Sequence, residues 1–411
     1  MNQHVSPALA IDAPVPPRPP VPLWLLALFV FSGTVAMHIF VPALPAAGAA
    51  LAASPAAMQM TVSLYILGLA FGQLIYGPIA DRFGRRPALI GGLVLYALAG
   101  GSALLATSVE ALVAARLFQA LGGCAGLVIS RAVVRDTSAP TDAARRLALM
   151  NLMVMVGPGV APVLGGFLSA TVGWRSIFLV TALFGLVNLA LAWGLLPETG
   201  IAGPRRARGA LMRDYLGLLR SPAFLGFAVG GSCATTSMYA FVAAAPFIFV
   251  HQLGRPDYEV GLYLAGMMLG VWFGSVAASR LIGRIPLGRL AVAANAASVV
   301  AAFVFLAAAL AGALSVPLVL GAMIVFNIGV GISAPVALAQ AVSVVDPRIV
   351  GSASGLYGAA QMAIGALCAA LAGLGADPAL AAAAVLAAAG LIAQAGFWLA
   401  LRRRPGEAAG A

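Results

Sequence analysis

The sequence predicts an all-α membrane protein with twelve transmembrane helices in two pseudo-symmetric halves of six. Hydrophobic residues make up 62% of the 411 residues and charged residues only 9%, whereas a soluble domain carries about a quarter charged residues. Apolar runs recur along the whole chain, each close to the roughly 20 residues that an α-helix needs to cross a bilayer. Strict alternation of apolar and polar residues is absent, which argues against an outer-membrane barrel.

The expected spans follow one another between short polar loops. Their limits are 23–46, 58–79, 88–108, 110–132, 147–171, 174–196, 222–250, 259–280, 287–311, 315–341, 350–373 and 379–401. A polar linker at 198–221 divides the chain into six-helix bundles at 23–197 and 222–401. The proline-rich residues 1–22 are expected to form a disordered cytoplasmic tail, and residues 402–411 a second cytoplasmic tail.

The basic residues, all of them arginines, give the expected orientation. Loops between alternate spans hold the clusters Arg82, Arg85 and Arg86; Arg135, Arg145 and Arg146; Arg205, Arg206, Arg208, Arg213 and Arg220; Arg280, Arg284 and Arg289; and Arg402, Arg403 and Arg404. The intervening loops hold only Arg175 and Arg255. This positive-inside pattern puts both termini in the cytoplasm. It also accounts for the net charge of +11 without a nucleic-acid partner.

The two halves look duplicated. In the first span, "MHIFVPALP" (37–45) can be laid over "MYAFVAAAP" (238–246) in the seventh, with five of nine positions identical and His38 facing Tyr239. Six-span halves in parallel repeat, with a site between them near the bilayer midplane, are typical of secondary transporters.

The loop "GPIADRFGRRPAL" (77–89) between spans two and three combines turn-forming glycines with charges at the membrane surface. Its spacing resembles the signature loop of the major facilitator superfamily; a merely solvated basic loop is the alternative. The resemblance implies a charge relay of Asp81, Arg85 and Asp136 that steadies an outward-open state. The implied conformational latch comprises Gly77, Asp81, Arg82, Gly84, Arg85, Arg86 and Asp136.

Spans four and five carry further matches. In "ARLFQALGG" (115–123), Arg116 and Gln119 match the family's span-four motif, although Ala120 replaces a glycine. An arginine inside the bilayer faces a wet cavity or the bundle interior, unless it snorkels to the interface. "GPGVAPVLGG" (157–166) resembles the motif of the antiporter branch, and generic glycine-rich helix packing is the alternative. The matching residues are Gly157, Ala161, Pro162, Gly165 and Gly166.

Together with "VPALP", "GWRSIF" and "LPET", these motifs most resemble drug/proton antiporters of the Bcr/CflA type, which export bicyclomycin and phenicols. The resemblance implies a cavity lined from spans one, four, seven and ten, by Met37, His38, Arg116, Gln119, Tyr239, Phe241 and Asn327. Relatives commonly place an aspartate where this chain has His38. No acidic residue lies in the core of any predicted span, so His38 is the candidate for proton coupling. The alternative is a neutral histidine that bonds to a backbone carbonyl and forms a polar wall.

We therefore expect a monomeric bacterial inner-membrane transporter. It would export small drug-like solutes, neutral or weakly anionic, by proton antiport through alternating access. Its expected partners are that solute, protons and the lipid bilayer. The rivals are an exporter of a sugar, amino acid or other metabolite, an importer, and a membrane sensor that transports nothing. We find no catalytic constellation, phosphate loop or metal-ligand spacing, and therefore expect no enzyme activity, cofactor or metal.

Overall fold

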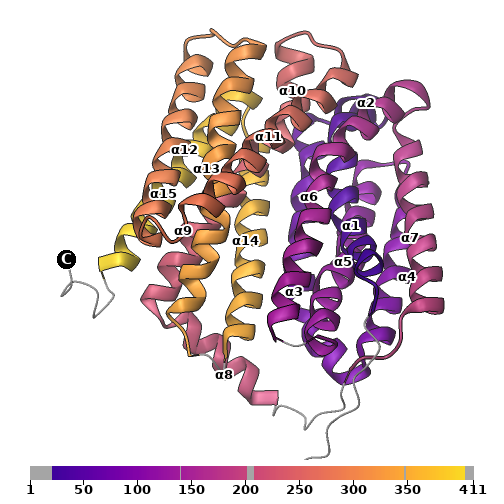
Figure 1. Ribbon diagram of the computed structural model, residues 1–411. Coiled ribbons are helices and arrows are strands. Elements are labelled where there is room, and N and C mark those ends of the chain that lie inside the picture. The colour runs from indigo at the N-terminus through magenta and orange to yellow at the C-terminus, as the bar shows by residue number, and fades with distance from the viewer. Residues whose placement is uncertain (1–20, 139, 201–207, 347–348, 403–411) are drawn as a thin grey trace, which may run out of the picture.

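The computed structural model describes residues 21–138, 140–200, 208–346 and 349–402, which are almost entirely helical (Figure 1). The first half contains α1 (Leu23–Ile39), η1 (Val41–Ala43), α2 (Leu44–Ala50), α3 (Pro55–Phe83), α4 (Arg85–Leu104), α5 (Val109–Asp136), α6 (Pro140–Thr171) and α7 (Arg175–Leu195). The second half contains α8 (Arg208–Leu219), α9 (Pro222–Thr236), α10 (Met238–Phe247), η2 (Ile248–Gln252), α11 (Asp257–Leu281), α12 (Leu287–Leu310), α13 (Val316–Ser343), α14 (Val350–Gly373) and α15 (Pro378–Arg402).

Eleven helical segments within the described residues are long and apolar enough to cross a membrane, and α6 adds a shorter apolar stretch at Val156–Thr171. All twelve predicted spans thus fall on helices, which confirms the predicted fold class. The predicted tails at 1–22 and 402–411 lie mostly outside the described residues. So does the middle of the predicted linker, whose last part forms α8, a helix that the sequence analysis did not predict.

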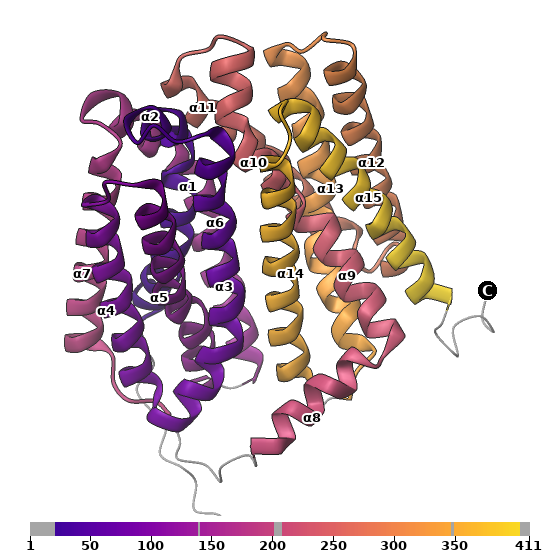
Figure 2. The ribbon, with the colours of Figure 1, turned by 180° about the vertical axis from the view of Figure 1, so that it is seen from behind.

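The first and seventh spans are broken helices, and proline contributes to both breaks. After α1, Pro42 is the second residue of the short 3₁₀-helix η1, and it favours the break because a proline lacks the N–H that a continuing α-helix would need. In the seventh span, α10 contains Pro246 and passes into the π-helix η2. The first span of each half, which contains the repeated motif, is therefore an interrupted helix near the centre of the molecule (Figure 2).

The two halves lie side by side and touch along two helix pairs, α3 with α14 and α6 with α11. We call the end of the bundle that bears the turn at Gly84 and helix α8 the basic end, and the other end the opposite end. Toward the opposite end, Gly261 of α11 sits directly against the backbone of Pro162, and Gly373 of α14 against Gln59. Small residues thus let the halves pack closely there.

Toward the basic end the halves separate. No neighbouring atom lies within 4 Å of the place where a Cβ would stand on Gly77 of α3, or on Gly351 and Gly355 of α14. The last interaction along this pair is the bond from Gln73 Nε2 to the carbonyl oxygen of Gly358, at 3.3 Å. The ribbons of α3 and α14 diverge below it (Figure 2). The packing between α3 and α14 is therefore close toward the opposite end and looser toward the basic end.

Candidate functional site

His38 lies in the last turn of α1 and has one ring nitrogen engaged. Its Nδ1 lies 2.8 Å from the carbonyl oxygen of Thr34. A carbonyl oxygen only accepts hydrogen bonds, so Nδ1 carries a hydrogen and Nε2 carries the lone pair of the neutral ring. Nε2 is buried and has no partner. The centre of the His38 ring is 6.5 Å from the centre of the Tyr239 ring in the other half. The ring is therefore fixed by a backbone carbonyl and keeps one free proton acceptor.

Arg116 lies in the interior of the N-terminal half, with 1% of its surface exposed. Its guanidinium carbon is 3.9 Å from the ring centre of Tyr65, 5.6 Å from that of Phe40 and 6.0 Å from that of Phe178. No carboxylate among the described residues pairs with it. Aromatic faces therefore stabilise this cation in place of a counter-ion.

The hydrogen bonds of Arg116 are incomplete. Nη1 donates to Oε1 of Gln119 at 2.7 Å, and Gln119 Nε2 in turn donates to Thr181 of α7 at 3.3 Å. Nε and Nη2 of Arg116 are buried without a partner. Buried unpaired donors on a charged group are unfavourable. The guanidinium is thus held in place, and the N–H groups of Nε and Nη2 remain available to any acceptor that enters.

The aromatic residues around Arg116 tie the first half together. The Tyr65 hydroxyl donates to the carbonyl oxygen of Gly33 at 2.8 Å, and the Tyr96 hydroxyl donates to that of Ser32 at 3.1 Å. Both bonds anchor neighbouring helices to α1, the helix that carries His38. Arg116 stacks on Tyr65, so this tyrosine links the arginine to the helix that carries His38. These contacts place the two ionisable side chains in one rigid unit.

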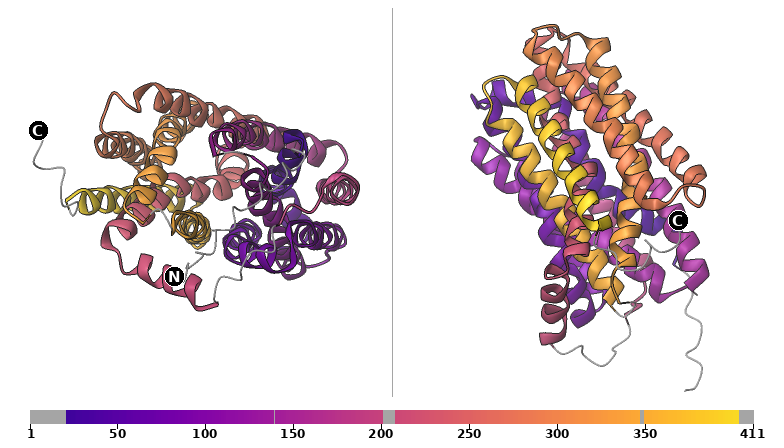
Figure 3. Two further views of the ribbon diagram at one scale, coloured as in Figure 1. Left: turned by 60° about the horizontal axis from the view of Figure 1, so that its bottom comes forward. Right: turned by 90° about the vertical axis from the view of Figure 1, so that its left-hand side faces the viewer.

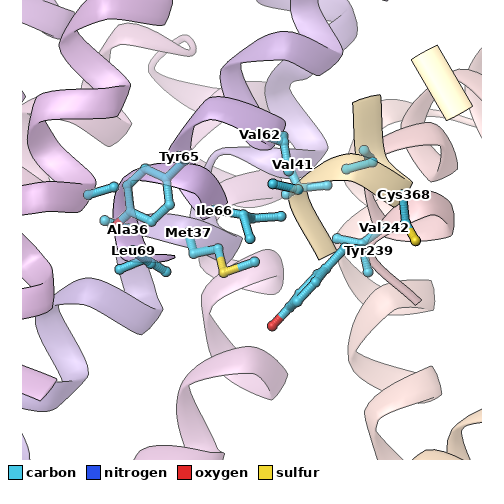
Figure 4. Packing of buried hydrophobic residues seen from close by; sticks show 14 of the residues in the cluster. Ala36, Met37, Val41, Val62, Tyr65, Ile66, Leu69, Tyr239, Val242 and Cys368 are labelled. Atoms are coloured by element: carbon cyan, nitrogen blue, oxygen red, sulfur yellow. The ribbon is translucent and has the colours of Figure 1, made fainter. Parts of the chain in front are cut away.

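The other predicted cavity residues divide into two groups. Met37 of α1 and Tyr239 of α10 extend toward one another from the two halves (Figure 4). Phe241 instead packs edge-to-face on Phe249 and Phe305, and the Asn327 side chain donates to the carbonyl oxygen of Met267 at 3.1 Å. These last contacts lie within the C-terminal half.

A polar cluster beside Tyr239 escaped the sequence analysis. Gln361 of α14 donates through Nε2 to the Thr235 hydroxyl at 2.8 Å, and Thr236 donates to the carbonyl oxygen of Gln361 at 2.9 Å. Gly365, one turn further along α14, lets the Tyr239 ring and the Thr236 side chain approach its backbone. A glutamine inside an apolar span was the available signal, but its partners lie about 125 residues away in sequence.

The predicted charge relay at the basic end is formed in the structure. Arg85 donates through Nε to Asp136 at 2.9 Å and through Nη1 to Asp81 at 2.5 Å. The chain turns between α3 and α4 at Gly84, whose φ of +98° suits glycine. Arg82 lies apart from the relay, with its guanidinium carbon 5.0 Å from the ring centre of Phe83.

Glu198, from the "LPET" stretch, adds a contact that the sequence analysis did not assign. Its carboxylate accepts the backbone N–H groups of Arg85 at 2.9 Å and Arg86 at 3.1 Å, at the start of α4. A carboxylate there satisfies free N–H groups and complements the positive end of the helix dipole. Arg86 reaches back to the carbonyl oxygen of Trp193 at 2.5 Å. The end of the first half is thereby fixed to the turn at Gly84.

The glycines predicted in span five bring α6 close to its neighbours. Gly165 meets the backbone of Ile39, one residue after His38, so closely that a side chain would not fit. At Gly157, a Cβ would lie 3.0 Å from the ring of Phe31. Gly166 faces Tyr258 of α11 in the other half. Helix α6 is thus packed between the histidine-bearing helix and the C-terminal half.

Comparisons with known proteins agree with this architecture. The chain is 28% identical over 324 residues to a bicyclomycin resistance protein homolog of Haemophilus influenzae, covering 77% of this chain and 80% of that protein. It is 29% identical over 262 residues to a chloramphenicol resistance protein of Pseudomonas aeruginosa, covering 64% of this chain and 61% of the relative, which is less than two thirds of that protein's length.

Solved structures resemble the fold over nearly the whole chain. The D-xylose-proton symporter matches with a TM-score of 0.73 at 16% identity, over 92% of this chain and 96% of the symporter. A bacterial homolog of the human lysosomal transporter Spinster matches with a TM-score of 0.67 at 18% identity, over 92% and 96%. The sequence profile of the Major Facilitator Superfamily matches residues 24–370. The chain therefore belongs to the Major Facilitator Superfamily and is a multi-pass membrane transporter rather than an enzyme.

Proposed function

We propose that this secondary transporter exports small drug-like solutes in exchange for protons across the bacterial inner membrane. The preferred solutes are neutral or weakly anionic and similar to phenicols or bicyclomycin. The observation that carries this proposal is the buried Arg116, which has no carboxylate partner among the described residues and keeps two unpaired N–H donors. The printed functions of the relatives, bicyclomycin and chloramphenicol resistance, support the same class of solute.

The charge of the site sets the substrate preference. A solute carbonyl, nitro or carboxylate oxygen can accept from Nε and Nη2 of Arg116, and this pairing removes the penalty of the two buried donors. A lipophilic cation finds a positive guanidinium and no buried carboxylate among the described residues. Tyr239 and the Gln361 cluster supply neutral hydrogen-bonding groups on the other side.

Proton coupling is assigned to His38. Its free Nε2 is the only buried histidine nitrogen without a partner in the described chain. Protonation there would add a second positive charge to the interior of the half that already buries Arg116, where the dielectric constant is low. The proton is therefore released when the site opens toward a compartment of higher pH. Solute bound at Arg116 and a proton bound at His38 can then alternate.

The halves pack closely at one end and loosely at the other, which supports alternating access. We infer from the positive-inside pattern that the basic end and both termini are cytoplasmic, and the looser packing of α3 on α14 at that end supports an inward-open state. Closure of the basic end would bring Gly77 of α3 against the start of α14, where Gly351 and Gly355 leave room. We propose that the latch at Arg85 and its two aspartates steadies that closed-inside state.

Drug susceptibility of a bacterial host that lacks its own pumps tests the proposal. Expression of the protein should raise the inhibitory concentration of a phenicol or bicyclomycin and leave that of ethidium unchanged. Arg116→Met, produced at the same membrane level, is the matched control and should give no resistance. Strong ethidium resistance would contradict the substrate preference. No resistance to any of these compounds would reject drug export and favour a metabolite exporter.

A further inference from the structure

Helix α8 lies at the basic end, along the outer edge of the C-terminal half (Figures 2 and 3). One face of it packs inward: Leu218 is buried, and Tyr215 is partly buried against the hydrophobic core. Asp214 on the same face accepts a hydrogen bond from the Ser352 hydroxyl at the start of α14, at 3.4 Å. This face holds α8 against the bundle.

A second face of α8 is apolar and exposed. Met212 is 60% exposed, Leu216 47% and Leu219 49%. Residues at positions i, i+4 and i+7 share one side of a helix, so these three side chains form a continuous stripe. The stripe is next to the packed face, and a row of large apolar side chains is unfavourable in water. We therefore expect these three side chains to face an apolar environment.

A third face of α8 is basic. Arg213 lies on α8, and Arg220 follows its last residue, Leu219. The backbone N–H of Arg220 still donates to the carbonyl oxygen of Leu216 at 3.2 Å, so the two arginines, seven residues apart, lie on one side, about 90° around from the apolar stripe. Both are exposed. Neither forms a salt bridge within the part of the chain that the structure describes. Arginine is suited to bind phosphate because its planar guanidinium presents paired donors.

We propose that α8 is a binding helix for anionic phospholipid. It lies in the membrane interface with Met212, Leu216 and Leu219 among the acyl chains, and Arg213 and Arg220 bind the lipid phosphates. The order of the faces supports this occupant, because a monolayer also passes from apolar chains to negative headgroups. The hydrogen bond from Ser352 to Asp214 joins the helix to α14, which packs along α3 of the other half. The bound lipid thus positions the basic end of α14.

The test uses the full chain with Leu216 replaced by cysteine and labelled with an environment-sensitive fluorophore. The native cysteines, Cys124, Cys233 and Cys368, are buried, and the unsubstituted chain measures any labelling of them. The protein is reconstituted in bilayers of equal parts phosphatidylcholine and phosphatidylglycerol. Either lipid carries bromine on its acyl chains, so that fluorescence quenching reports which lipid contacts the label.

We expect brominated phosphatidylglycerol to quench more strongly than brominated phosphatidylcholine. Arg213→Gln and Arg220→Gln should each reduce this preference by about fivefold, while brominated phosphatidylcholine still quenches the label. The matched control is Arg284→Gln, which removes an exposed arginine from another loop at the same end. Equal quenching by the two lipids would overturn the recognition of charge. No quenching by either would place α8 outside the bilayer. A fluorescence shift in detergent that depends on protein concentration would show that a second copy covers the stripe.

Discussion

The two halves share one fold but differ in where they bury charge. The N-terminal half encloses Arg116 and His38, whereas every buried polar side chain described in the C-terminal half belongs to an uncharged residue. Asn295, for example, donates to the carbonyl oxygen of Gly390 at 3.0 Å and to Gln394 at 2.6 Å. Neutral amides suit helix packing and solute recognition, whereas an ionisable pair suits proton coupling. This difference underlies our proposal that proton coupling resides in the N-terminal half and neutral recognition in the C-terminal half.

The loops at the basic end repeat this contrast. Gly283, with a φ of +89°, lies in the corresponding loop of the second half, so both loops contain a glycine with positive φ, although the loop between α11 and α12 is longer than the turn at Gly84. In the second half, however, Arg280 stands three residues before its glycine, where the first half has Asp81, and no ion pair forms there among the described residues. The latch is therefore expected to act on one side only.

The strongest test of the asymmetry is His38→Ala. If coupling resides in the N-terminal half, this substitution should abolish uphill efflux driven by a pH gradient in proteoliposomes. Downhill counterflow should remain within about twofold, because the solute-binding donors of Arg116 are intact. Tyr239→Phe, at the matched position of the other half, should leave uphill efflux in place. Uphill efflux by His38→Ala would reduce the histidine to a polar wall and move coupling elsewhere.

Arg116→Met should have the next largest effect. Loss of charge-assisted hydrogen bonds predicts solute binding about 10- to 100-fold weaker, measured by titration in detergent. The same change should raise the thermal unfolding midpoint, because it removes a buried cation and its unpaired donors. Arg116→Lys, which keeps the charge but loses the planar stacking on Tyr65, separates the two contributions. Unchanged affinity in Arg116→Met would place the solute elsewhere.

Asp81→Asn should lower turnover by about tenfold, because a partly buried ion pair such as that with Arg85 contributes about 1 kcal/mol or somewhat more. Solute affinity should not change, because this ion pair lies far from Arg116. Turnover is measured as counterflow, and affinity by titration of the same preparation. Arg284→Gln in the second half is the control and should change neither. An equal loss of affinity in Asp81→Asn would contradict a latch that acts only on conformational change.

The sequence predicted the helices well and the contacts unevenly. Span lengths and arginine-rich loops follow from the bilayer itself, so the twelve spans could be predicted from composition. The relay at Arg85 followed from a dense local motif. Contacts between distant spans could not be predicted, because no local sequence pattern specifies them. Examples are the aromatic rings around Arg116, the hydrogen bond from Thr236 to Gln361 and the packing of Phe241 on Phe305. Helix α8 was missed because a short amphipathic helix in a polar linker lacks the length of a span.

The smallest expected effect concerns Glu198, whose carboxylate caps α4 in the first half. Glu198→Gln keeps a hydrogen-bond acceptor but removes the charge that complements the helix dipole, so stability should fall by about 1 kcal/mol. Glu198→Ala should cost somewhat more, since the N–H groups of Arg85 and Arg86 then lose their acceptor. Thermal unfolding in detergent measures both. Solute affinity should not change, because the cap is remote from Arg116. If neither variant loses stability, water replaces the cap, and the "LPET" stretch then serves only to end the first half.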